Sequence, residues 1–206
     1  MRKYSSLLGL LIPLLAACSL GQPASIEPVS VSDEVVIPAE EVIPATLAES
    51  AAQEAGGSQR PTWQTLSLTN AHTGQTFSFA DFAGKTVLVE PMATWCTNCR
   101  RQQGNLREAR AQLGEDKYAY ISLQIETNVS NQELAQYADD LGFEWTFAVV
   151  TPELLQELIN TFGRTITNPP STPHFIIRPD GTTTELFTGF EDATALVIKL
   201  TEISGA

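Results

Sequence analysis

The chain has 206 residues, of which 43% are hydrophobic, and its formal net charge at pH 7 is −12. This length and composition suffice for one folded domain with appended segments, while the negative charge excludes non-specific binding to the phosphates of nucleic acids. Three cysteines are too few for a disulfide-rich scaffold or for the four ligands of a structural zinc site.

The first residues have the composition of a secretion signal. Arg2 and Lys3 precede an almost wholly apolar stretch from Leu7 to Ala17. This stretch is shorter than the roughly 20 apolar residues of a membrane-spanning helix, so we predict a signal peptide over residues 1–17. It ends in Leu-Ala-Ala-Cys18, which resembles the lipobox of bacterial lipoproteins. The resemblance implies cleavage before Cys18 and lipidation of its sulfur; an ordinary secretion signal with an incidental cysteine is the alternative.

Residues 18–60 have the composition of a disordered acidic tether. Pro, Ala, Ser and Glu dominate, aromatic residues are absent, and seven acids accompany one base, Arg60. Such a segment cannot bury enough apolar surface to offset the entropy lost on ordering. With two or more acyl chains on Cys18, the protein would be anchored to a membrane by lipid rather than span it.

Residues 61–206 are predicted to form one α/β domain. Alternating apolar residues and short apolar runs predict strands, and capping residues with glycine stops predict helices. The expected strands are 63–68, 86–89, 118–125 and 145–150, with a hairpin of 175–177 and 185–187. The first expected helix follows Cys99 and runs to Leu113, and the others cover 131–141, 152–162 and 192–203. This order predicts a mixed central sheet flanked by helices on both faces.

Cys96 and Cys99 stand between a predicted buried strand and a predicted helix. A C-x-x-C pair in that position is typical of a thioredoxin-like redox motif. On a first helical turn the two Cα atoms lie about 5–6 Å apart, a distance that a disulfide closes. The partial positive charge of a helix N-terminus stabilises a thiolate at Cys96. We expect Cys96 to be exposed and to attack, and Cys99 to resolve the mixed disulfide.

The segment from Gly84 to Arg100 resembles the active-site segment of the membrane-anchored thioredoxins, the TlpA and ResA group. The resemblance covers residues 62–203 and implies a thioredoxin-like fold without a cofactor. It also implies an extracytoplasmic thiol-disulfide oxidoreductase that reduces client proteins, in cytochrome c maturation or in general thiol reduction, with electrons from a membrane thiol transporter. Thr172-Pro173 stands where this family keeps a cis-proline that faces the cysteines, so Pro173 is an expected site residue.

Glu90 interrupts an apolar run six residues before Cys96. Thioredoxins place a buried acid at this point, and desolvation there would raise the pKa of the carboxyl group. We predict that Glu90 exchanges a proton with Cys99; a structural hydrogen-bonding role is the alternative.

Two other functions fit the sequence less well. Copper-delivering relatives of thioredoxin use two cysteines and a histidine, ligand types that Cys96, Cys99 and His174 would offer. Those relatives, however, separate their cysteines by three residues, and this chain separates them by two. A peroxiredoxin is not expected, because Ala93 rather than Thr or Ser stands three residues before Cys96.

The two arginines after the cysteine motif have two interpretations. Arg100 and Arg101 follow the motif, where they form either a solvated helix face or a basic surface that attracts an acidic partner.

Overall fold

The computed structural model describes residues 60–205, so the predicted signal peptide, Cys18 and most of the predicted tether lie outside the described residues. The strands are β1 (Leu68–Thr69), β2 (Thr76–Phe77), β3 (Thr86–Met92), β4 (Tyr118–Gln124), β5 (Thr146–Val149) and β6 (Phe175–Ile177). The α-helices are α1 (Thr97–Leu113), α2 (Asn131–Leu141), α3 (Pro152–Phe162) and α4 (Ala193–Ser204). In the part of the chain so described, no helix is long and apolar enough to cross a membrane.

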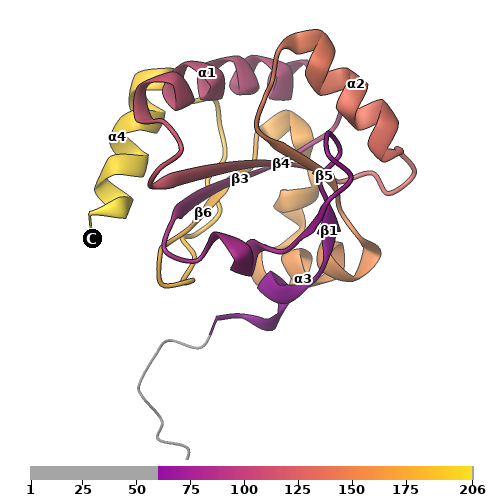
Figure 1. The fold of residues 1–206 in the computed structure, drawn as a ribbon, viewed down its shortest axis with the longest axis horizontal. Coiled ribbons are helices and arrows are strands. Elements are labelled where there is room, and N and C mark those ends of the chain that lie inside the picture. Colours follow the sequence, from indigo (N-terminus) through magenta and orange to yellow (C-terminus); the bar gives the residue numbers. More distant parts are fainter. Residues whose placement is uncertain (1–59, 206) are drawn as a thin grey trace, which may run out of the picture. The chain divides into compact units, whose positions relative to one another are not determined.

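Four strands form the central sheet in the order β5-β4-β3-β6. β3, β4 and β5 are mutually parallel, and β6 runs antiparallel to β3. Figure 1 shows α1, α2 and α4 over one face of this sheet and α3 under the other. The predicted mixed sheet with helices on both faces is therefore confirmed.

The side chains of β3 alternate between two halves of the core. Leu88 and Met92 pack with side chains of α1, α2 and α4, whereas Val87 and Val89 pack with α3 and Trp63. Because successive residues of a strand point to opposite faces, Glu90 shares the face of Leu88 and Met92. Glu90 thus lies on the side of the sheet that carries α1.

The helix boundaries follow the capping residues closely. α2 and α3 begin and end at the predicted residues. Ser130 and Thr151 cap their first turns by accepting backbone N–H groups. Gly142 ends α2 with a φ of 67°, a conformation that favours glycine.

The predicted strand over residues 63–68 is wrong for most of its length. Residues Thr62–Thr65 form a short 3-10 helix, and strand β1 starts only at Leu68. Trp63 and Gln64 are both buried, although neighbouring residues of a strand point to opposite sides. The Gln64 side chain donates to the carbonyl of Gly181 at 2.9 Å, which favours the helical turn.

The predicted hairpin has one regular arm, β6, and one irregular arm. Residues 183 and 187 pair with Ile177 and His174 only as isolated bridges. Between them the hydroxyl of Thr184 accepts the N–H of Ile176 at 3.0 Å, in place of a carbonyl. This side-chain bond interrupts the regular ladder.

Candidate active site

Cys96 and Cys99 form a disulfide at the start of α1, beyond the carboxyl end of β3. Their Cα atoms lie 5.3 Å apart, within the range expected for one helical turn. Cys96 is the N-cap residue, and its Sγ accepts the N–H of Cys99 at 3.1 Å. The structure thus places a redox-active type of disulfide at the positive end of a 17-residue helix.

The two sulfur atoms have different polar neighbours. Sγ of Cys96 faces an N–H donor, which stabilises a thiolate. Sγ of Cys99 lies 3.3 Å from the carbonyl oxygen of Pro169, an acceptor that favours a protonated thiol. In the reduced pair, the N–H donor beside Cys96 favours a thiolate there, and the carbonyl acceptor beside Cys99 favours a thiol.

The expectation that Cys96 is exposed is wrong. Its relative exposure is 2%, against 0% for Cys99. The segment Pro169–Ser171 packs against the start of α1, and the Asn98 side chain donates to the carbonyl of Pro170 at 2.9 Å. Exposure therefore does not distinguish the two cysteines in the disulfide form, whereas their polar neighbours do.

The loop that leads into α1 is held by the end of β4. The Gln124 side-chain oxygen accepts the N–H of Thr94 at 3.1 Å, and its amide nitrogen donates to Glu126 at 3.2 Å. Trp95, which is 59% exposed beside Cys96, donates from its indole nitrogen to Glu126 at 2.9 Å. No sequence pattern points to Gln124 or Glu126, because their contribution depends on the pairing of β4 with β3.

Glu90 is buried, with a relative exposure of 2%. Among the described residues, neither of its carboxyl oxygens has a hydrogen-bond partner. Burial raises the pKa of Glu90 to about 8. The hydroxyl of Ser122, its neighbour across β3 and β4, is not in hydrogen-bonding geometry but still opposes part of this rise. The predicted direction of the pKa shift is therefore confirmed, and Glu90 can hold or release a proton near neutral pH.

A buried polar network lies beside Glu90. Ser122 pairs with Glu90 in the register of β3 and β4. Its hydroxyl oxygen accepts from the indole of Trp145 at 2.9 Å and from the amide of Gln103 at 3.4 Å. Tyr137 in turn donates to the Gln103 side-chain oxygen at 2.7 Å. Because both bonds to Ser122 use N–H donors, its own hydroxyl proton is available to the Glu90 carboxyl group.

The cis bond that the resemblance implied before Pro173 is not found, because the peptide bonds of residues 60–205 are all trans. The chain turns instead at Thr172, which has a φ of 46°. Its N–H donates to the carbonyl of Pro169 at 2.8 Å, and its carbonyl lies 3.1 Å from Nδ1 of His174. These bonds hold a left-handed conformation that β-branched residues rarely adopt, and they direct the chain into β6.

The register of the sheet explains why proline is tolerated at positions 91 and 173. The β3–β6 ladder ends where Val89 pairs with Phe175, so Pro91 and Pro173 each lie two residues beyond its last pair. Neither residue has an N–H group that the end of the ladder would leave unpaired. Pro173 therefore lies beside the carboxyl end of β3, the end that leads to Cys96.

His174 has structural partners on both ring nitrogens. Nδ1 contacts the Thr172 carbonyl, and Nε2 lies 3.4 Å from Glu191 and 3.4 Å from Lys199. Burial acts to raise the pKa of Glu191, but His174 and Lys199 outweigh it and lower this pKa to about 2. Within residues 60–205, no group of three or more His, Cys, Asp and Glu side chains is placed to hold a metal ion. The structure thus does not assemble the alternative copper site of Cys96, Cys99 and His174.

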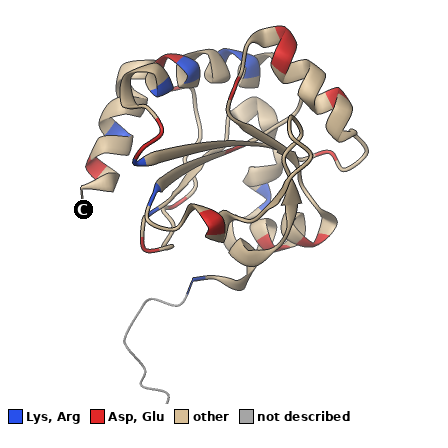
Figure 2. Ribbon diagram, viewed as in Figure 1, with Lys and Arg blue, Asp and Glu red and all other residues tan. Residues whose placement is uncertain are grey.

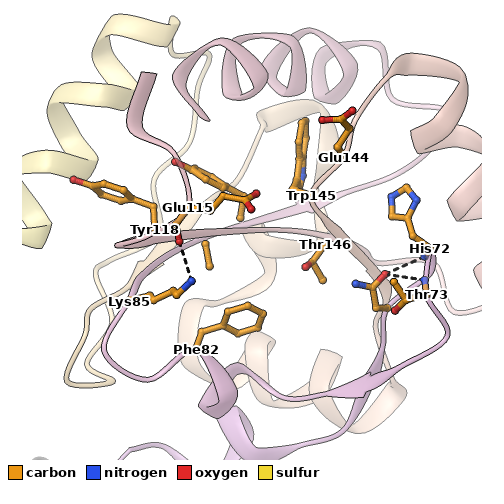
Figure 3. Close-up of a pocket in the computed structure, with 12 residues that line it drawn as sticks. His72, Thr73, Phe82, Lys85, Glu115, Tyr118, Glu144, Trp145 and Thr146 are labelled. Carbon is orange, nitrogen blue, oxygen red and sulfur yellow. Dashed lines mark hydrogen bonds between the residues drawn. The ribbon is translucent and has the colours of Figure 1, made fainter. Parts of the chain in front are cut away.

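A separate pocket lies at the opposite end of the strands. Figure 3 shows it between Lys85, Tyr118 and Thr146, residues at the amino ends of β3, β4 and β5. Lys85 donates to the carbonyl of Glu115 at 2.8 Å. Since the disulfide follows the carboxyl end of β3, this pocket contributes nothing to the redox site.

Comparisons with known proteins agree with this geometry. Residues 59–185 match the AhpC/TSA family. A thiol:disulfide interchange protein of the thioredoxin family from Chlorobium tepidum is 20% identical, with a TM-score of 0.56, over 68% of this chain and 93% of its own. A secreted disulfide oxidoreductase of Mycobacterium tuberculosis, homologous to E. coli DsbE, is 13% identical, with a TM-score of 0.54, over 68% and 97%. ScoI of Arabidopsis thaliana, solved with copper bound, is 13% identical, with a TM-score of 0.55, over 68% and 97%. At these identities the likeness establishes the thioredoxin-like fold.

Proposed function

Because this chain belongs to the AhpC/TSA family and is a thioredoxin-like oxidoreductase, we propose that it exchanges thiols and disulfides with client proteins outside the cytoplasm. The observation that carries this proposal is the contrast between the two sulfur atoms. Sγ of Cys96 accepts a hydrogen bond from the N–H of Cys99 at the start of α1, and Sγ of Cys99 faces the carbonyl oxygen of Pro169. Ala93 supports disulfide exchange rather than peroxide reduction, since it offers no hydroxyl group three residues before Cys96.

The reaction begins with the reduced pair. The thiolate of Cys96 attacks one sulfur of a client disulfide, forms a mixed disulfide, and releases the other client sulfur as a thiolate. The start of α1 supplies the electrostatic stabilisation that keeps Cys96 ionised.

The second step uses Cys99 and Glu90. Cys99 transfers its proton to the Glu90 carboxylate, and its thiolate attacks Sγ of Cys96. The mixed disulfide breaks, the client leaves as a thiolate, and the Cys96–Cys99 disulfide forms. Two electrons pass from the protein to the client, and Glu90 then returns its proton to solvent or to the departing thiolate. A pKa of about 8 suits Glu90 to this exchange.

The direction we propose is reduction of the client, with a membrane thiol transporter as electron donor. The resemblance to the TlpA and ResA group supports this direction and a role in cytochrome c maturation or general thiol reduction. The lipobox at Cys18 supports attachment to the outer side of a membrane.

The reduction potential of the Cys96–Cys99 pair tests this direction. The full chain is equilibrated with a series of glutathione ratios, and the fraction of disulfide is measured by thiol labelling. A potential near that of thioredoxin, about −270 mV, supports a reductase. A potential near that of strong periplasmic oxidants, about −120 mV, contradicts it.

A further inference from the structure

A pocket of about 280 Å³ lies beside the disulfide, and the mechanism above does not use it. One wall is formed by Asn98 and Arg101 at the start of α1. The opposite wall consists of residues 170–172 together with Gly189 and Phe190. Asn98 is two residues from Cys96, so a group bound here lies close to the reacting sulfur.

The walls of this pocket are fixed by hydrogen bonds. The Asn98 side chain donates to the carbonyl of Pro170 at 2.9 Å, which joins α1 to the opposite wall. The N–H of Gly189 donates to the carbonyl of Ser171 at 2.8 Å, which joins the two segments of that wall. The pocket is thus largely formed before a ligand binds.

Arg101 is the charged group of the pocket. Its guanidinium carbon lies 4.7 Å from the ring centroid of Phe190, which is 50% exposed. Within residues 60–205, no carboxylate lies within ion-pair distance of Arg101, whereas Arg110 on the same helix pairs with Glu115 and Glu144. Figure 2 shows basic positions along α1 and acidic positions on the neighbouring α2.

We infer that this pocket binds an acidic side chain of the client, close in sequence to the cysteine that Cys96 attacks. A guanidinium group presents a planar fork of donors that matches a carboxylate, and stacking on Phe190 restricts its orientation. In the complex, the exposed face of Phe190 packs against the methylene groups of the client's acidic side chain. The inference rests on the proposed disulfide exchange and names the class of client segment that the site prefers.

The experiment compares synthetic peptides that share one disulfide and differ in one residue within three positions of the cysteine. That residue is Glu, Gln or Lys, and each position is scanned in turn with the full reduced chain in mild detergent. At low salt the Glu peptide is expected to react about two- to fivefold faster than the Gln peptide, the range of an exposed ion pair. The preference is expected to decline as salt is added.

Four variants locate the effect. Arg101→Gln is expected to remove the preference for Glu, and Arg101→Glu is expected to reverse it in favour of Lys. Arg100→Gln changes the net charge by the same amount outside the pocket and is expected to retain the preference. Phe190→Leu, which keeps an apolar residue but removes the stacking ring, is expected to weaken it.

The outcomes separate this inference from the function on which it rests. Equal rates for Glu, Gln and Lys peptides, or equal loss of preference in Arg100→Gln and Arg101→Gln, would overturn the inference while exchange itself persists. Failure to reduce any of the peptides would contradict both the inference and the proposed function.

Discussion

Glu90 lies opposite Ser122 in the register of β3 and β4. Ser122 accepts hydrogen bonds from Trp145 and Gln103. The pKa of Glu90 is about 8, because burial raises it and the Ser122 hydroxyl offsets only part of that rise. The acid that interrupts an apolar strand is thus placed next to a group that adjusts its pKa. This relationship determines the pH range in which Glu90 can serve Cys99.

Replacing Glu90 by Gln preserves the shape of the side chain and removes the proton acceptor. We expect resolution of the mixed disulfide to slow by about 10²-fold, since general base assistance contributes roughly 10²–10⁴. Attack by Cys96 should change little, because its thiolate is stabilised by the helix start. Stopped-flow kinetics separate the two steps, and equal slowing of both would leave Glu90 with a structural role.

Ser122→Ala provides the matched variant for the tuning of Glu90. Loss of the hydroxyl removes the contribution that lowers the Glu90 pKa, so the midpoint of the pH–rate profile for resolution should move upward. A purely structural role for Ser122 would change the rate without moving this midpoint. The measurement is the resolution rate between pH 5 and pH 10 in both proteins.

The same carboxyl group makes the folding stability depend on pH. Its pKa is raised from 4.5 in the unfolded chain to about 8 in the fold, so between these values the folded state binds more protons. Stability is therefore fully present below about pH 4.5 and declines as pH rises toward 8, by about 1.4 kcal/mol per pH unit. Denaturant titrations should show a flatter profile for Glu90→Gln and higher stability at pH 7. Parallel profiles for the two proteins would mean that Glu90 is not the buried acid described here.

The thiol of Cys96 should have a pKa well below the ordinary value of about 8.5. The helix start and the N–H of Cys99 stabilise the thiolate. In Cys99→Ser, the rate of alkylation against pH reports this pKa, and mass spectrometry of the peptide that contains Cys96 keeps Cys18 out of the signal. An ordinary midpoint would remove the electrostatic reason for attack by Cys96.

The elements that the sequence predicts well are those determined by local chemistry. Ser130, Thr151 and Gly142 set the ends of α2 and α3 through capping and a left-handed turn. The spacing of Cys96 and Cys99 likewise determines their separation on one helical turn.

The features missed in the sequence depend on contacts between distant segments. Ser122 meets Glu90 only through the register of β4 on β3, and Pro169 reaches Cys99 across 70 residues of chain. Trp63 belongs to a helical turn because its neighbour Gln64 bonds to Gly181, 117 residues away. Local periodicity contains no information on such pairings.

Membrane attachment is predicted to depend on Cys18. Cys18→Ser should abolish incorporation of labelled lipid and release the protein from membranes, because the acyl chains are the anchor. Disulfide exchange by Cys96 and Cys99 should persist in the released protein. If the variant stays in the membrane fraction, the apolar stretch Leu7–Ala17 is acting as an uncleaved anchor.

Trapping of the mixed disulfide tests the central claim most directly. Cys99→Ser leaves Cys96 able to attack and removes the thiol that resolves the intermediate, so mixing it with a disulfide-containing protein should yield a stable covalent complex. Mass spectrometry should place the link at Cys96 and show its loss on reduction, and Cys96→Ser should form no such complex. Absence of a complex with Cys99→Ser, or a link through another residue, would contradict the assignment of Cys96 as the attacking group of a thiol-disulfide oxidoreductase.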